Sequence, residues 1–378
     1  MKPRFIDVCH LSWILAAATF LPSRTAFCAT DPTLNASVVR TNQSITVSWA
    51  SANSVPYQVQ SSSDLTSWSN IGSVMTGNGS TLLLTTSIIN QGNRFFRVTR
   101  LFPAAPGTAV FNPATGLLTI VCDALHNVIN VANDGTGVIF VNSGAIPVTG
   151  GVATTANTVL IQILGTPGDD QITLGNGLVT AHIFGAGGND ALTGGDGNDT
   201  IVSGPGNSVV HGGRGNDSIF LGNGSNVVVW NPGDASDTII GQGTNNTLLF
   251  NGANVSEKIE LFANGTGSLL TRDVANIVMN MQGVQTVDIN ALGGADTLTI
   301  DPLNGTGVAQ VNIDLSSPPG SGTGDGAADS VVINGTAAAD TFNIAANGSA
   351  VEVSGLGTLV HVTGGELAND RIAVNGVG

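Results

Sequence analysis

Apolar and polar residues alternate along most of this chain with a period of two, in runs of four to six residues separated by glycine, asparagine and serine. Beyond the first twenty-odd residues, no stretch shows a convincing helical period. The pattern therefore predicts an all-β protein built from many short strands and tight turns. The clearest runs outside the repeats described below are residues 44–49, 57–60, 94–98, 117–122, 128–131, 138–141 and 159–164.

The first thirty residues differ from the rest. Lys2 and Arg4 precede an apolar run at 11–21 that is too short to span a bilayer, and small residues follow around Cys28. This order predicts an export signal over residues 1–29. The alternatives are a lipid attached to Cys28 and a buried N-terminal helix.

Residues 33–101 are predicted to form a small β-sandwich. The segments SITVSWA, YQVQSSSDLTSWSNIG and NRFFRVTR resemble fibronectin type III-like modules of secreted bacterial proteins. The resemblance implies a spacer or a binding module, with glycan binding as one alternative resting on fold analogy alone. A short linker, FPAAPG, follows at 102–107.

A nine-residue repeat begins at residue 165. Six turn residues, which are rich in Gly, Asn and Asp, precede three strand residues, of which the middle one is apolar. Two repeats would make one coil, so equivalent positions should recur every eighteen residues. Intervening segments keep the length and lose the Asp. The repeats read GTPGDDQIT (165–173), GAGGNDALT (185–193), GGDGNDTIV (194–202) and GGRGNDSIF (212–220).

The eighteen-residue spacing predicts which side chains stack in the core. Ile201 and Ile219 should lie in one sheet, and Leu192, Val210 and Val228 in the other.

The Asp that closes each turn suggests a metal. Calcium takes six to eight oxygen ligands, mostly carboxylates and carbonyls, and turns stacked eighteen residues apart supply both. Asp199 and Asp217 are the best pair, Asp217 with Asp237 is a second, and Asp170 with Asp190 is a third, on the opposite edge. The edge that carries this third pair continues with three neutral residues, and we expect it to hold no ion beyond Asp190. These residues are Ser208, Asn226 and Asn246.

The pattern resembles the hemolysin-type (RTX) calcium repeat, GGxGxDxUx, where U is a bulky apolar residue. The resemblance implies a calcium-binding β-roll over 165–250. It also implies backbone ligands at Gly194, Asp196, Gly212, Arg214 and Gly215. The alternative is that these turns are merely capped by their own Asp side chains.

The flanks of the array are less regular. Residues 108–164 are predicted to be degenerate β coils leading into it, and residues 251–378 either a degenerate, mostly metal-free solenoid or a separate β-domain. Gly293-Gly294-Ala295-Asp296 echoes the repeat without its full set of glycines.

Composition narrows the function. Of 378 residues 51 are Gly, and the net charge is −15. Without residues 1–29 the basic count falls from 11 to 8 and the acidic count from 26 to 25, giving −17. Such acidity argues against nucleic acid or an anionic membrane as partner and suits divalent cations. Cys122 would be the single remaining cysteine, so no disulfide within one molecule can stabilise the chain.

No zinc-ligand spacing, nucleophile elbow or phosphate loop is present, and we expect no enzyme. The sequence predicts a secreted or surface calcium-binding protein, structural or adhesive, whose β-roll folds on binding calcium. Cell-surface or extracellular matrix components are its expected partners, and no membrane span is expected. The alternative is an accessory module or a fragment of a larger secreted hydrolase or toxin.

Overall fold

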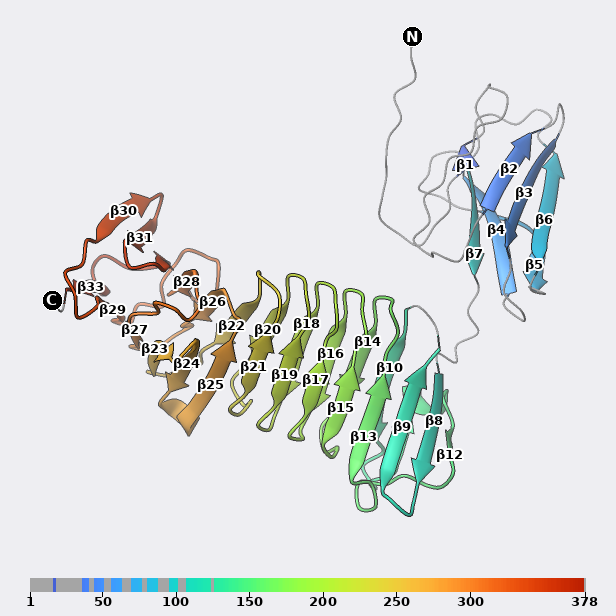
Figure 1. Cartoon of the computed structure of the whole chain (residues 1–378), viewed down its shortest axis with the longest axis horizontal. Coiled ribbons are helices and arrows are strands. Elements are labelled where there is room, and N and C mark those ends of the chain that lie inside the picture. The colour runs from blue at the N-terminus through green and yellow to red at the C-terminus, as the bar shows by residue number, and fades with distance from the viewer. Residues whose placement is uncertain are drawn as a thin grey trace, which may run out of the picture. The chain divides into compact units, whose positions relative to one another are not determined.

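The fold is all-β and divides into two compact units, residues 1–105 and 106–378 (Figure 1). The computed structural model describes residues 16–17, 36–40, 44–50, 56–62, 69–76, 80–87, 95–100, 107–123 and 126–376.

The first unit is a β-sandwich, as predicted. One sheet has the strand order β2-β3-β6 and the other β1-β7-β4-β5, and all pairs within them are antiparallel. Alternate residues of β3, β4 and β7 form a shared core around Trp49 and Tyr57, whose ring centroids are 5.9 Å apart. The strands are β1 (Ala16–Ala17), β2 (Ala36–Arg40), β3 (Ser44–Ala50), β4 (Pro56–Ser62), β5 (Ser69–Thr76), β6 (Thr81–Ser87) and β7 (Phe95–Arg100).

Two predictions for this unit stay predictions. The first is the resemblance to fibronectin type III modules, which the sandwich architecture alone does not test. Of the predicted export signal, the structure describes only Ala16–Ala17, which pair with β7. The remainder of residues 1–29 lies outside the described residues.

The second unit is a solenoid of two long sheets, mainly parallel, whose strands stack side by side along the molecule (Figure 1). Between residues 160 and 251 successive strands alternate between the sheets, which is the topology of a β-roll. The 14-stranded sheet has, in spatial order, β12 (Val148–Thr149), β8 (Gly107–Asn112), β9 (Leu117–Cys122), β13 (Leu160–Leu164), β15 (Ala181–Phe184), β17 (Thr200–Val202), β19 (Ser218–Leu221), β21 (Thr238–Gly241), β25 (Ile277–Gln282), β24 (Gly267–Arg272), β23 (Lys258–Asn264), β27 (Thr297–Ile300), β29 (Ser330–Asn334) and β33 (Arg371–Asn375). The 12-stranded sheet has β11 (Ile139–Val141), β10 (Val128–Asn133), β14 (Gln171–Leu174), β16 (Ala191–Gly195), β18 (Val209–Gly213), β20 (Val227–Trp230), β22 (Thr247–Asn251), β26 (Thr286–Asn290), β28 (Gln310–Asp314), β32 (Leu359–Thr363), β31 (Ala350–Ser354) and β30 (Asn343–Asn347).

The predicted eighteen-residue register is confirmed. Ile201 of β17 pairs with Ile219 of β19, while Leu192, Val210 and Val228 follow one another across β16, β18 and β20. All five are at most 1% exposed. Each three- to five-residue strand points one or two side chains inward, so consecutive coils bury a continuous aliphatic column.

Residues beyond 251 continue both sheets and share one core with the repeats. The departure from regular coiling is a three-stranded antiparallel meander, β23-β24-β25, which is inserted between β21 and β27 in the 14-stranded sheet only. In the 12-stranded sheet β22 pairs directly with β26. Antiparallel strands also lie at both ends of the 12-stranded sheet, β11 at one and β31 and β30 at the other.

Cys122 is a free thiol inside this core. Burial, reinforced by the nearby Asp170 and Asp123, raises the pKa of the thiol to about 12, which makes it unreactive at neutral pH. Within the described part of the chain, no helix reaches the length and apolar content that crossing a bilayer requires.

Candidate metal centre

The predicted metal-binding aspartates form two rows, one along each edge of the solenoid. Asp199, Asp217 and Asp237 each end the turn that precedes a strand of the 14-stranded sheet. Asp170 and Asp190 occupy the same position before strands of the 12-stranded sheet. All five are between 2% and 4% exposed.

Within a row, each carboxylate bonds to the coil before it. The backbone N–H of Asp199 donates to Oδ1 of Asp217 at 2.7 Å, and that of Asp217 donates to Oδ1 of Asp237 at 2.9 Å. On the other edge, Asp170 N–H donates to Oδ1 of Asp190 at 2.8 Å. One oxygen of each of these carboxylates therefore fixes the stacking of two turns.

The second carboxylate oxygen has a different environment. Among the described residues, Oδ2 of Asp190, Asp199 and Asp217 is buried without a hydrogen-bond partner. A Cβ on Gly194 would lie 2.4 Å from Oδ2 of Asp199 and 2.4 Å from the carbonyl oxygen of Gly212 in the next coil. Two oxygen acceptors thus converge on one point, an arrangement that is unfavourable unless a proton or a cation lies between them.

In the matched turns, the first position needs glycine for the same reason. A Cβ on Gly212 would meet Oδ2 of Asp217 at 2.2 Å, and one on Gly185 would meet Oδ2 of Asp190 at 2.3 Å. The carboxylate occupies the space that any side chain would need. Further along the turn, Gly215 has a φ of 110° and lies so close to the carbonyl of Gly197 that only glycine fits.

Burial raises the pKa of these carboxyl groups well above 3.8: to about 7 for Asp190, Asp199 and Asp237, and to about 8 for Asp217. Neighbouring carboxylates add to the effect. The turns therefore disfavour the negative charges that the sequence places in them, and a bound cation would offset this.

Residues 182–210 and 193–228 match the family model of the RTX calcium-binding nonapeptide repeat (4 copies). This stretch carries hemolysin-type calcium-binding repeats. The matched residues include Asp190, Asp199 and Asp217, whose Oδ2 atoms have no hydrogen-bond partner among the described residues, and exclude Asp170 and Asp237. No curated protein shows significant similarity to the chain.

Outside the hemolysin-type repeats, Asp170 differs from the aspartates of the matched turns. Its Oδ1 accepts hydrogen bonds from the backbone and side-chain nitrogens of Asn127 at 2.8 and 2.7 Å, and its Oδ2 accepts from Thr166 N–H at 2.7 Å. Both oxygens are thus satisfied by protein donors. The geometry favours the turn-capping interpretation for this residue, whereas Oδ2 of Asp190 has no donor among the described residues.

The neutral residues that follow Asp190 in this row bond to one another. Ser208 N–H donates to Oδ1 of Asn226, and Asn226 Nδ2 donates to Oδ1 of Asn246 at 3.0 Å. Asn246 Nδ2 then donates to the carbonyl oxygen of Gly283 at 2.9 Å. An amide hydrogen here fills the place between two acceptors that is open in the hemolysin-type repeats.

The remaining predicted ligands lie in the turns around Asp199 and Asp217. Oδ2 of Asp196 accepts from Gly177 N–H at 2.7 Å, and its Oδ1 is buried and unpartnered within the described structure. The Arg214 side chain is 65% exposed and its guanidinium lies 3.9 Å from Asp196. The role that the resemblance implies for Arg214 is that of its backbone carbonyl, and it stays a prediction.

In the described ranges, no three His, Cys, Asp or Glu side chains come together in a group that would hold a metal alone. An ion in these turns must take much of its coordination from backbone carbonyls, which suits calcium, since it accepts such oxygens at flexible geometry.

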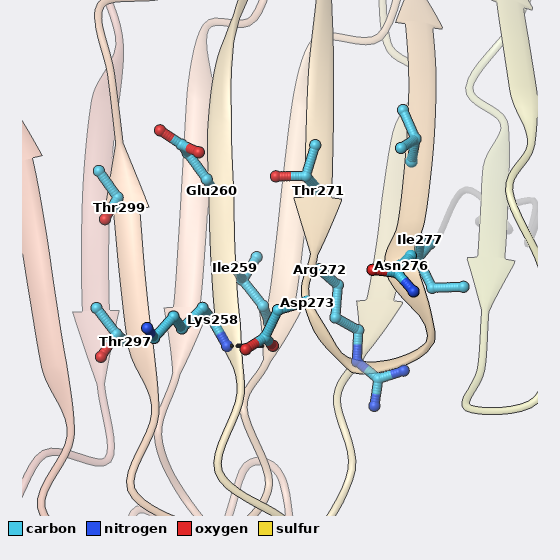
Figure 2. A pocket seen from close by; sticks show the side chains of 11 residues that line it. Lys258, Ile259, Glu260, Thr271, Arg272, Asp273, Asn276, Ile277, Thr297 and Thr299 are labelled. Atoms are coloured by element: carbon cyan, nitrogen blue, oxygen red, sulfur yellow. Dashed lines mark hydrogen bonds between the residues drawn. The ribbon is translucent and has the colours of Figure 1, made fainter.

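The meander β23-β24-β25 brings a positive charge to the row that starts at Asp199. Arg272, at the end of β24, donates from Nε to Oε1 of Glu257 at 2.8 Å, and both side chains are at most 3% exposed. Arg272 also lines an open groove of about 420 Å³ (Figure 2). At its rim Lys258 N–H donates to Oδ1 of Asp273 at 2.8 Å.

Residues that the sequence did not predict as ligands continue this row beyond the repeats. They are Glu257, Asp296, Asp329 and Asp370, each directly before a strand of the 14-stranded sheet. Their spacings of 39, 33 and 41 residues hide the period. The six-residue turn ALGGAD ending at Asp296 was the one available signal.

Proposed function

We propose that this chain is a secreted or cell-surface structural protein, adhesive to surface or matrix components, whose β-roll folds on binding calcium. The observation that supports it best is the set of buried, unpartnered carboxylate oxygens at Asp190, Asp199 and Asp217, which coincide with the hemolysin-type repeats. A structural role is proposed because the sequence offers no catalytic motif and the solenoid is a continuous packed rod.

Calcium and folding should be coupled for a physical reason. The ligands of each turn come from coils eighteen or more residues apart, so they meet only in the folded chain. The turns are rich in glycine, which makes ordering them entropically expensive. An ion that binds only the folded state adds stability by mass action, about 1.4 kcal/mol per site when free calcium is about tenfold above the dissociation constant.

Calcium would be plentiful only after export, which agrees with the predicted signal at residues 1–29 and the strongly acidic composition. A solenoid that completes its folding outside the cell would then act as a rigid spacer. The sandwich unit has its own core around Trp49 and Tyr57 and needs no ion.

The test uses the chain from residue 30 onward in calcium-free buffer. We expect far-ultraviolet circular dichroism to gain β signal as calcium is added, and calorimetry to detect binding. Asp199→Asn and Asp217→Asn should each weaken the affinity at least about tenfold, since each removes a charged ligand. The control is Asp134→Asn, because Asp134 caps an exposed turn through Thr136. Identical spectra with and without calcium, together with no binding heat, would refute the proposal.

A further inference from the structure

The turn that ends at Asp296 has the backbone of a matched repeat turn, although it lies far outside the matched residues. Ala186 and Leu292, at the second turn position, have φ angles of 73° and 70°. Gly188 and Gly294, at the fourth, have φ angles of 104° and 116°. Left-handed φ angles are rare for non-glycine residues, so their occurrence at both Ala186 and Leu292 indicates that the two turns share one backbone conformation.

The two turns also stack alike on the coil before them. A Cβ on Gly188 would strike Gly168 and Asp169 within 2.8 Å, and one on Gly294 would strike Val255 and Ser256 within the same distance. Glu257 N–H donates to Oδ1 of Asp296 at 2.8 Å, just as Asp170 N–H donates to Oδ1 of Asp190 at 2.8 Å.

Toward the following coil, Asp296 reproduces the best pair of the hemolysin-type repeats. Asp296 N–H donates to Oδ1 of Asp329 at 2.8 Å, and the corresponding Asp199–Asp217 distance is 2.7 Å. Asp296 is 2% exposed, and no described residue donates a hydrogen bond to its buried Oδ2. That is the same unpartnered oxygen found at Asp199 and Asp217.

Burial raises the pKa of Asp296 to about 7, and the negative charges of Asp329, Glu257 and Asp325 add to the rise. Asp325 reaches back from its own turn, and its Oδ2 accepts from Gly294 N–H at 2.6 Å. Glu257 is already neutralised by Arg272, whereas no basic side chain is bonded to Asp296, Asp325 or Asp329 in the described structure.

We propose that the turns at 291–296 and 324–329 form a further calcium site, in which Asp296 is the central carboxylate ligand, backbone carbonyls of the two turns complete the coordination, and Asp329 and Asp325 add negative charge nearby. Hard oxygen donors of mixed carboxylate and backbone origin suit calcium better than magnesium, which demands a near-ideal octahedron. This site does not depend on calcium binding by the hemolysin-type repeats, because its carboxylates are its own.

One departure from the matched turns predicts a weaker site. The first turn position is Ala291, where the repeats have the glycine that makes room for Oδ2, and Ala291 is 1% exposed. Its methyl group reduces the space beside the carboxylate. Ala291→Gly should therefore tighten the site, whereas a purely structural Asp296 would show no change in calcium binding.

The experiment counts calcium ions per chain by equilibrium dialysis and measures affinities by calorimetry. Asp296→Asn should lose one ion and leave the affinities of the others unchanged, with Asp134→Asn as the control. Asp199→Asn combined with Asp217→Asn should lose other ions and keep this one, so failure of the proposed function is separate from failure of this site.

Ala291→Gly keeps the proposal testable if Asp296→Asn does not fold. We expect Ala291→Gly to bind the last ion more tightly at unchanged stoichiometry. An unchanged ion count in folded Asp296→Asn, or an Ala291→Gly titration identical to that of the unmodified chain, would overturn the proposal.

Discussion

The guanidinium carbon of Arg272 lies 5.4 Å from the ring centroid of Trp230, and the same group pairs with Glu257 inside the solenoid. Trp230 is itself stacked on Phe250, with ring centroids 4.2 Å apart. Because Arg272 belongs to the inserted meander, the row of carboxylates receives a covalently attached cation between the repeats and the later coils. Glu257 therefore needs no ion.

Removing this cation should destabilise the solenoid strongly. Arg272→Met leaves Glu257 buried and charged, and we expect a loss of about 3–5 kcal/mol in the free energy of unfolding. The double variant Arg272→Met, Glu257→Gln removes both charges and should recover much of the loss. Urea denaturation in saturating calcium measures both; equal losses in the two variants would show that the buried charge is not the cause.

Glycine at the first turn position should give the hemolysin-type repeats their full calcium affinity. Gly194→Ala places a Cβ 2.4 Å from Oδ2 of Asp199, so the carboxylate must move and the calcium affinity should fall at least about tenfold. Gly187→Ala is the matched control, because the nearest atom to its Cβ would be 3.5 Å away. Calcium calorimetry compares them, and similar affinities would contradict the assigned position of the ion.

Without calcium, the stability of the β-roll should fall as pH rises. Burial raises the pKa of Asp199 to about 7 and that of Asp217 to about 8, from an ordinary 3.8. Between about pH 4 and pH 7 the folded state therefore holds more protons than the unfolded state, so raising the pH favours unfolding. Since calcium binds the ionised form, its stabilising effect should instead grow with pH.

Differential scanning calorimetry at pH 5 and pH 8 tests both signs. In calcium-free buffer the solenoid transition should be lower at pH 8, and the shift produced by millimolar calcium should be larger there. A calcium-free transition temperature that is constant or higher at pH 8 would rule out protonated carboxyl groups in the empty turns.

A carboxylate at Asn246 should create a new requirement for calcium. The Nδ2 of Asn246 donates to the carbonyl of Gly283, and Asn246→Asp replaces this donor by an acceptor. We expect about 1–3 kcal/mol lower stability in calcium-free buffer, with partial recovery in calcium. Thermal unfolding in the two buffers measures it, and Asn246→Ala, which supplies no ligand, should show the loss without the recovery.

The amino-acid sequence by itself determined the local features of this protein. The nine-residue repeat specifies turn and strand within a few neighbouring residues, and a constant coil length turns this into the pairing of Ile201 with Ile219 and of Asp199 with Asp217. Glycine and apolar positions alone carry that information, because turn angles and inward-pointing side chains are local properties.

Only the tertiary structure decided which distant turns face each other once the spacing became irregular. Asp170 is satisfied by Asn127, 43 residues earlier, and Asp296 lies between Glu257 and Asp329, 39 and 33 residues away. The meander enters one sheet and leaves the other unbroken, so the later register follows from strand pairing and cannot be counted along the chain. Whether a carboxylate oxygen is satisfied or left open depends on the atoms that this pairing places against it. For that reason both oxygens of Asp170 have protein donors, whereas Oδ2 of Asp296 has none among the described residues.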